Sequence, residues 1–478
     1  MKIKHLILLL LPLQFLAQNT AFSPYTRYGL GEMVAPTFMT GNAMGGAFIA
    51  YKPDSTAPTF INTGNPAAYP LIRFTTFEVG GTYRYSDLSN ANSSTRKWGT
   101  NFSYASLGFP VRQKGGAVLG IQPFSFVGYD MKEVNTNANS VDVTGYYQGS
   151  GGLSKAFIGY GVMPFQDAAI RYKRAIQTIP DSLLTITRGE NRFRYFMRKA
   201  ASDLSFGTNV GWLFGSLEQT DRLTYPSSTL YNYVFRQRLY TFHGLTYNVG
   251  VQGAFTVDSV HAKKDTLLHR RALKQRFRLT YGAYMNVGSS VGTTYDDVAL
   301  TYILNTSGQE IVRDTLVYNV DKSGSQKLPT EIGVGLGFKK GERLQIVVDA
   351  ARTSWKGWLV NGVNQGLTDN LRLAVGVNFV PDKDAAGKGT FARRMQYRIG
   401  AQYQSGYINI RNTNVPDYSL SFGAGLPIGY KYASSMVNVF ARVGVMGSNA
   451  NNLVLEKYFR FGVGFTFTDR WFQKFRYD

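Results

Sequence analysis

Alternation of apolar and polar residues is the clearest pattern in the chain, and it is strongest near the C-terminus. In the segment 457–467, every second residue is apolar: Phe459, Phe461, Val463, Phe465 and Phe467. The intervening positions are Tyr458, Arg460, Gly462, Gly464 and Thr466. A period of two residues predicts a β-strand with one apolar face and one polar face. An unbroken apolar face needs no covering layer if it faces lipid.

The same alternation recurs along most of the chain and predicts an all-β fold. About fourteen segments share it: 74–86, 97–109, 115–129, 151–163, 203–217, 238–256, 276–288, 331–339, 343–351, 370–381, 395–407, 417–426, 435–446 and 457–467. Their second face carries Gly, Asn, Thr and Arg, which suits a lumen better than a dry core. We therefore expect a transmembrane antiparallel β-barrel over 74–467, closed so that no backbone edge lies in lipid. An array of soluble β-sandwiches is the alternative.

The N-terminus has the organisation of a secretory signal peptide. Lys2 and Lys4 precede the apolar run 6–13, and the small residue Ala17 stands before Gln18. This pattern predicts that residues 1–18 are removed after export. The run is shorter than the ~20 residues that span a bilayer as a helix. Export together with a barrel pattern predicts the outer membrane of a Gram-negative bacterium.

Composition narrows the chemistry that the chain can perform. Its 478 residues include no cysteine and four histidines, while charged residues make up 17% and there are 31 Tyr, 32 Phe and 51 Gly. Thiolate metal sites and cysteine nucleophiles are therefore excluded. No Gly-x-Ser-x-Gly elbow between a predicted strand and a helix is found, and a His-Glu-x-x-His motif is absent, so we expect no enzyme, no catalytic residues, no cofactor and no metal.

Residues 19–73 do not alternate and form a separate region before the barrel. Small residues and an Asn-Pro-Ala triplet stand out there, at Gly41, Gly45, Gly46, Asp54, Asn65, Pro66 and Ala67. No strand precedes the glycines and no Gly-Lys-Ser/Thr follows them, so this is not a phosphate-binding loop. Small residues allow close backbone packing, which would suit a plug inside a lumen.

In this region the chain resembles the FadL/TodX family of outer-membrane transporters for hydrophobic compounds. The shared pattern is a small-residue run with paired glycines (Gly45-Gly46), then an acidic position (Asp54), then Asn65-Pro66-Ala67 before the first strand. The ending, 468–478, resembles the extra tail of Bacteroidota members. The resemblance implies an N-terminal plug and a hydrophobic path that leaves sideways through the barrel wall.

In that family the sideways path passes a kink in the third strand. The matching positions here are Gly120, Pro123 and Phe124. Proline removes a donor from the strand ladder, so it belongs at edges, bulges or gaps. We expect broken strand pairing near Pro123. Whether the break is a portal or a locally unpaired site without a portal stays open.

The net charge of +22 is unevenly distributed over the predicted topology. The predicted external loops, including 130–150 and 289–330, are slightly acidic. The predicted periplasmic connection 164–202 carries eight basic and three acidic residues and is long for a periplasmic turn. A candidate partner surface within it comprises Arg171, Lys173, Arg174, Arg192, Arg194, Arg198 and Lys199. It could cap the lumen, lie on anionic lipid, dock a protein, or be a solvated insertion; nucleic acid is not an expected partner.

Charged residues also recur on the predicted lumen face. They are Glu78, Arg84, Arg278, Glu331, Arg372, Arg398, Arg442 and Arg460. They could guide an amphipathic anion, or pair with one another and fill the interior.

Two functions follow from these patterns. The first is passage of hydrophobic or amphipathic small molecules through a plugged lumen and a lateral portal, in contact with outer-membrane lipids. The second is a non-transporting barrel subunit of an outer-membrane machine for barrel assembly or protein secretion. Such a subunit would bind other outer-membrane or periplasmic proteins through its basic periplasmic segments.

Overall fold

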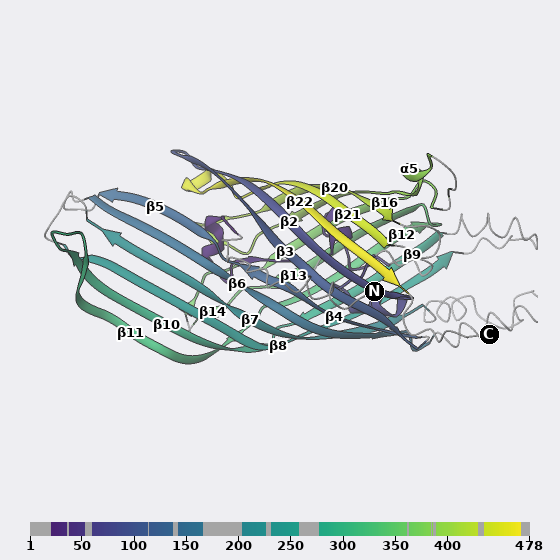
Figure 1. The fold of residues 1–478 in the computed structure, drawn as a ribbon, viewed down its shortest axis with the longest axis horizontal. Helices are drawn as coiled ribbons and strands as arrows, with labels where there is room; N and C mark the ends of the chain where they lie inside the picture. Colours follow the sequence, from purple (N-terminus) through teal and green to yellow (C-terminus); the bar gives the residue numbers. More distant parts are fainter. Residues whose placement is uncertain are drawn as a thin grey trace, which may run out of the picture.

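The chain forms a closed antiparallel β-barrel of 14 strands (Figure 1). The computed structural model describes residues 21–35, 38–52, 60–112, 114–136, 142–165, 203–225, 231–257, 277–360, 363–383, 385, 389–428 and 435–469. The barrel closes where the last strand, β22 (Leu455–Asp469), pairs with the first long strand, β2 (Thr75–Ser89). This closure confirms the predicted fold class.

Going around the barrel, each of the other positions in the wall is occupied either by a single strand or by two strands that follow each other in the chain. The single strands are β3 (Ser94–Val111), β6 (Asp142–Val162), β7 (Ser205–Thr224), β8 (Tyr233–Val257), β13 (Leu344–Ser354), β16 (Asn370–Phe379), β17 (Gln396–Gln404), β20 (Asp417–Ile428) and β21 (Ser435–Met446). The interrupted positions are β4 (Gly115–Phe126) with β5 (Tyr129–Thr136), β9 (Phe277–Val287) with β10 (Ser290–Leu304), and β11 (Glu310–Lys327) with β12 (Thr330–Lys340).

The predicted alternation is visible in the exposure of the strands. Phe461 of β22 is 41% exposed, whereas Thr466 on the opposite face of the same strand is 2% exposed. Aromatic and aliphatic side chains point outward all around the wall, while the inward positions carry glycines, polar residues and those apolar residues that pack on the N-terminal segment. The exterior is therefore suited to lipid, and no second layer is needed to cover it.

The outer part of the barrel differs from the sequence prediction. Residues 130–150 and 289–330 were expected to be external loops, but β5, β6, β10 and β11 run through them and extend one side of the wall outward (Figure 1). Most of β11 is exposed on both faces, so it has no apolar face to bury and no alternation to detect. Two small hairpins, β14 (Leu359–Val360) with β15 (Val363–Asn364) and β18 (Asn409–Ile410) with β19 (Thr413–Asn414), lie outside the main sheet.

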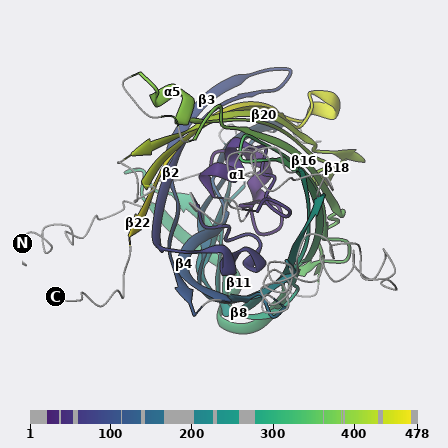
Figure 2. The same cartoon turned by 90° about the vertical axis from the view of Figure 1, so that its right-hand side faces the viewer.

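The N-terminal segment, here the described residues between 21 and 72, lies inside the ring of strands (Figure 2). It contains the short elements η3 (Pro24–Arg27), β1 (Glu32–Met33), α1 (Met39–Ala43) and η4 (Pro66–Leu71). Outside the lumen stand α5 (Phe391–Arg394) and η6 (Ala450–Asn452). None of the helices in the described part of the chain is long and apolar enough to cross a bilayer.

Two apolar layers, formed by the N-terminal segment and the wall, lie in the lumen. The first is built around Phe38, Met44 and Phe48 of the N-terminal segment, which pack on Tyr284, Val347 and Phe440 of the wall. The second lies farther out, where Leu30 packs with Leu153, Leu213, Phe242 and Trp355. A polar region remains between them, and it holds the candidate site.

Candidate functional site

Glycines in the wall provide the seat for the N-terminal segment. A Cβ atom added to Gly207 would lie 2.3 Å from the Pro66 carbonyl, and one added to Gly400 would lie 2.1 Å from the Met44 carbonyl carbon. Every wall position except β13 and β21 supplies at least one such glycine, with an atom of the N-terminal segment within 3.0 Å of the built Cβ. One from each position is Gly80, Gly108, Gly116, Gly161, Gly207, Gly250, Gly282, Gly335, Gly376, Gly400, Gly423 and Gly464.

The residues singled out by the small-residue pattern lie within this contact. Gly45 and Gly46 have positive φ angles of 67° and 80°, which favour glycine. The Gly45 N–H donates to Ser421 Oγ at 2.7 Å, and the Gly46 carbonyl accepts from Arg372 Nη1 at 3.0 Å. Gly41 lies in α1. Asp54 is outside the described residues.

Asn65, Pro66 and Ala67 begin the helix η4 and fix its direction. The Asn65 side-chain oxygen accepts from the Ala67 N–H at 3.2 Å, and its amide nitrogen donates to the Ile49 carbonyl at 2.9 Å. Pro66 stands at the first helical position, where no backbone donor is needed. Asn65 therefore joins two parts of the N-terminal segment, and it is completely buried.

Asp349 of β13 binds the N-terminal segment on the side of the barrel opposite η4. The sequence pattern did not indicate this residue. Its Oδ2 atom accepts the N–H groups of Phe48 and Ile49 at 2.6 and 2.7 Å. It interrupts a strand of small and apolar residues (Val347-Val348-Asp349-Ala350-Ala351). An acidic residue on the inward face of such a strand is the one signal that could have indicated it.

Most of the predicted lumen charges point inward and are hydrogen-bonded. Arg372 and Arg442 bind carbonyl groups of the N-terminal segment, at Gly46 and Asn42. Arg398 donates to Asn438 Oδ1 at 2.8 Å, and Glu78 accepts from Thr466 Oγ1 at 2.8 Å. Glu331 accepts from Tyr284 and from Asn286. Arg278 is exposed at the end of β9.

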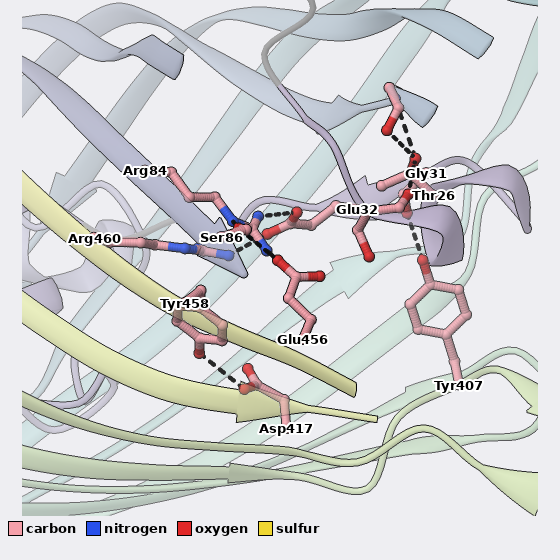
Figure 3. Close-up of polar contacts among 12 residues, drawn as sticks. Thr26, Gly31, Glu32, Arg84, Ser86, Tyr407, Asp417, Glu456, Tyr458 and Arg460 are labelled. Carbon is pink, nitrogen blue, oxygen red and sulfur yellow. Dashed lines mark hydrogen bonds and ion pairs between the residues drawn. The ribbon is translucent and has the colours of Figure 1, made fainter. Parts of the chain in front are cut away.

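Arg84 and Arg460 belong to a compact ionic cluster around Glu32 (Figure 3). The Glu32 carboxylate, on β1, forms ion pairs with both arginines. Arg84 also contacts Glu456 Oε1 at 2.5 Å, and the Ser86 hydroxyl donates to the same oxygen at 2.7 Å. The cluster thus connects the N-terminal segment to β2 and β22, the two strands that close the barrel. Neither Glu32 nor Glu456 was indicated by the sequence pattern.

A cavity of about 270 Å³ lies between the two apolar layers. Many of its lining residues are amides. Three of them form a hydrogen-bonded row across neighbouring strands, from Asn209 to Asn248 at 3.4 Å and from Asn248 to Asn286 at 2.6 Å. Trp355 and Tyr407 line its outer side, and their rings stack with centroids 4.7 Å apart. The cavity therefore combines a row of amides with aromatic and aliphatic side chains.

One corner of the cavity reaches a break in the barrel wall. The pairing of β3 with β4 ends at Ala105 and Ile121, two residues before Pro123. From there β1 takes the place of β3: Glu32 and Met33 pair with Phe126 and Ser125, and the Val34 N–H donates to the Phe124 carbonyl at 3.0 Å. Gly120 lies just before the break, and its Cβ would meet the Ala105 carbonyl at 2.7 Å.

The connection between β13 and β16 packs on the second apolar layer. Trp355 and Leu367 are buried there against the residues of the second layer. Asp369 organises the connection: its Oδ1 accepts the N–H groups of Trp355 and Lys356 at 3.0 and 2.9 Å, and its Oδ2 binds Arg352. The Lys356 N–H and the Arg352 guanidinium hold the pKa of the Asp369 carboxyl below its usual range.

The predicted partner surface at Arg171, Lys173, Arg174, Arg192, Arg194, Arg198 and Lys199 lies outside the described residues, as do residues 1–18 and 470–478 of the predicted signal peptide and tail. Among the residues that are described, no group of three or more His, Asp and Glu side chains could hold a metal ion.

The closed barrel with an apolar exterior and a filled lumen defines an outer-membrane β-barrel protein. Within that class, the chain belongs to the BamG family, whose model matches residues 1–173 and 193–478. The sequence resemblance predicted a member of the FadL/TodX family. The family model that matches is BamG, and the likeness to FadL-type channels is a likeness of fold. No curated protein sequence matches the chain.

Solved structures of FadL-type channels share this fold at low sequence identity. The TodX deltaS2S3 mutant monoaromatic hydrocarbon channel is 13% identical, with a TM-score of 0.51 and coverage of 91% of this chain and 99% of that one. The CymD monoaromatic hydrocarbon channel is 11% identical, with a TM-score of 0.49 and coverage of 93% and 99%. A Pseudomonas aeruginosa FadL homologue is 12% identical, with a TM-score of 0.49 and coverage of 91% and 99%.

Proposed function

We propose that the protein is a non-transporting barrel subunit of an outer-membrane machine for barrel assembly or protein secretion. The observation that carries this proposal is the seat of the N-terminal segment on glycines from twelve wall positions. An N-terminal segment that contacts twelve of the fourteen wall positions could open an axial path only by breaking those contacts. The match to the BamG family supports the same role.

A subunit of this kind should be purified with its partners. We expect an affinity-tagged chain, extracted from its native host in a mild detergent, to carry other outer-membrane or periplasmic proteins in fixed stoichiometry, identified by mass spectrometry. A tagged outer-membrane barrel of unrelated function from the same host is the control. Recovery as a monomer that holds lipid or detergent in its lumen would contradict the proposal.

The basic insertion 164–202 is the first candidate contact within such a complex. Deleting 168–199 should remove one or more partners from the purified complex while the barrel still folds. Heat-modifiable migration on a gel reports the folded barrel. A deletion that leaves both the partners and growth unchanged would exclude a role for this insertion.

Lateral passage of a hydrophobic or amphipathic molecule is a second candidate function. The specific observation in its favour is that the cavity extends to the wall break at Pro123 and Phe124. The chain has no cysteine, so Met33→Cys and Phe102→Cys, both lining the cavity, can be bridged selectively by a bis-maleimide. If the break is a portal, the bridge should abolish protein-dependent uptake of N-phenylnaphthylamine by vesicles containing the purified barrel. Uptake no faster than in protein-free vesicles would exclude this function.

A further inference from the structure

We propose that an anionic phospholipid binds at the inner rim of the barrel, the end where β2 begins and β22 ends (Figure 1). The site is formed by Lys340 and Arg343 together with Phe277 and Phe338. The phosphate of the headgroup lies between the two basic side chains, and the upper part of the acyl chains lies on the two rings. The site is independent of the proposed subunit role, because it lies on the lipid-facing exterior and uses neither the N-terminal segment nor the cavity.

The turn between β12 and β13 places the two basic residues at the inner rim. β12 ends at Lys340 and β13 begins at Leu344, so the turn spans only 341–343. It is closed by the Arg343 N–H, which donates to the Lys340 carbonyl at 3.3 Å. Short turns are typical of the periplasmic end of an outer-membrane barrel. The lipid beside this turn is therefore the phospholipid of the inner leaflet.

A row of side chains across five strands shows the level of the membrane interface. Strand pairing places Phe277, Lys340, Leu344, Phe379 and Tyr397 next to one another around the wall, in that order. Residues that pair directly across strands lie on one face of the sheet. The three aromatic residues of the row are 41%, 40% and 40% exposed on the lipid-facing side. Because aromatic girdles lie at the membrane interfaces of such barrels, Lys340 lies at the level of the lipid headgroups.

The two positive charges at this level have no acidic partner. Lys340 and Arg343 are both exposed, and neither forms an ion pair with any residue in the part of the chain that the structure describes. The acidic residue between them, Glu342, contacts Lys383 at 3.0 Å instead. Basic residues near an anionic membrane surface strengthen its binding, so this turn presents two cations to the headgroup region.

An aromatic pair provides the apolar half of the site. The rings of Phe277 and Phe338 stack with their centroids 5.6 Å apart. The Lys340 Nζ atom lies 5.6 Å from the centroid of the Phe277 ring, where the ring attracts the ammonium group. The lysine stem can thus cover apolar surface while its charge stays among the headgroups. Cations beside lipid-facing rings match an amphiphile whose phosphate is joined to acyl chains.

Charge and position together select the lipid. Lipid A also carries phosphate, but it belongs to the outer leaflet, at the other end of the strands. The headgroup of phosphatidylethanolamine carries an ammonium group, which Lys340 and Arg343 would repel. Phosphatidylglycerol has a phosphate without an amine, and both cations can form charge-assisted hydrogen bonds with it. We therefore expect a preference for phosphatidylglycerol.

Native mass spectrometry of the full barrel, titrated with phosphatidylglycerol in detergent, tests the site. The test variant is Lys340→Gln/Arg343→Gln. The control, Lys132→Gln/Lys457→Gln, removes the same charge from exposed lysines near the outer end, one of which lies 5.6 Å from the centroid of the Tyr146 ring. We expect the Kd of the first lipid adduct to rise about tenfold in the test variant and less than about twofold in the control. Phosphatidylethanolamine should bind the unmodified barrel about fivefold more weakly.

An aromatic variant separates a lipid site from a purely ionic contact. Phe277→Leu removes the ring beneath the Lys340 ammonium group, and we expect the Kd for phosphatidylglycerol to rise about threefold. Phe422→Leu, at a lipid-facing residue that is 51% exposed away from the inner rim, is the control and should leave the Kd unchanged. The exchange Lys340→Arg/Arg343→Lys keeps both charges and should retain binding. Heat-modifiable migration shows that each variant is folded.

Several results would overturn the lipid site. An unchanged Kd in Lys340→Gln/Arg343→Gln, or an equal rise in the control double variant, would show that phosphatidylglycerol does not bind at this turn. A preference for phosphatidylethanolamine or for lipid A, added in the same detergent, would show that the occupant is wrong. An unchanged Kd in Phe277→Leu would exclude the aromatic half of the site.

Discussion

Glu32 of the N-terminal segment forms an ion pair with Arg84 of β2, across the lumen side of the wall break. Because Glu32 also belongs to β1, which is paired with β4, this contact connects β4 to β2, the strand that pairs with β3 on the far side of the break. Arg460 adds the closing strand β22 to the same carboxylate. One side chain thus links β4, β2 and β22 (Figure 3).

Replacing Glu32 with Gln should destabilise this part of the barrel. Arg84 keeps its contact with Glu456, whereas Arg460 loses the carboxylate that it contacts in the cluster. Because hydrogen bonds to charged groups contribute about 1.5–3 kcal/mol, we expect a loss in that range in the free energy of unfolding, measured by urea titration in detergent. Proteolysis within residues 21–35 should also become faster.

A surface ion pair provides the control for the Glu32 variant. Glu342 contacts Lys383 at 3.0 Å, and both side chains are about a third exposed. Exposed pairs contribute about 1 kcal/mol or less, so Glu342→Gln should leave the unfolding midpoint nearly unchanged. Equal effects of the two substitutions would show that the Glu32 cluster does not stabilise the contact between the N-terminal segment and the wall.

The glycine seat makes a second prediction, at Gly207. A Cβ there would lie 2.3 Å from the backbone of Pro66, so Gly207→Ala should displace η4 and destabilise the fold by about 1–3 kcal/mol, as overpacked interiors do. Gly81→Ala is the matched control, because its Cβ would meet only the Asn101 carbonyl at 3.5 Å. Urea unfolding and protease cleavage between 60 and 72 measure both variants. If Gly207→Ala is as well tolerated as Gly81→Ala, the N-terminal segment is not tightly seated.

The sequence predicts the wall of this protein better than its interior. The alternation around Phe461 is a local property, so the strand and its lipid-facing side could be read directly. β11 escaped detection because it is exposed on both faces. The sequence predicts that Asn65-Pro66-Ala67 precedes the first long strand. The contact of this triplet with Gly207 cannot be predicted unless the arrangement of the strands is known. The contact between Glu32 and Arg460 joins residues 428 apart, and nothing in either local sequence indicates it.

Asn65 offers an isosteric test of the motif that the sequence indicated. Its amide nitrogen donates to the Ile49 carbonyl at 2.9 Å in a completely buried site. In Asn65→Asp, a carboxylate oxygen would face that carbonyl, and we expect a loss of about 3 kcal/mol or more, because an unpaired buried charge is costlier than a lost neutral hydrogen bond.

The control for Asn65 is Asn90→Asp. The Asn90 side-chain oxygen accepts from Asn92 and Ser93 in an exposed turn, and aspartate keeps both bonds. Its effect on unfolding should be below about 0.5 kcal/mol, as for most surface substitutions. A neutral Asn65→Asp variant would show that this asparagine does not hold the two parts of the N-terminal segment together.

Acid should loosen the connection between β13 and β16, which covers the buried side chains of Trp355 and Trp358. The folded pKa of Asp369 lies below its unfolded value, so the stabilisation it provides is present above about pH 4 and is lost as the pH falls through the folded pKa. Acrylamide quenching of tryptophan fluorescence should therefore increase below about pH 4, because Trp355 and Trp358 become accessible. Asp369→Ala should be more strongly quenched already at pH 7, with a smaller further change in acid. Asp87→Ala, in an exposed pair with Arg96 at 4.0 Å, should behave like the unmodified protein; an Asp369→Ala variant with the same acid transition would show that another group controls this cover.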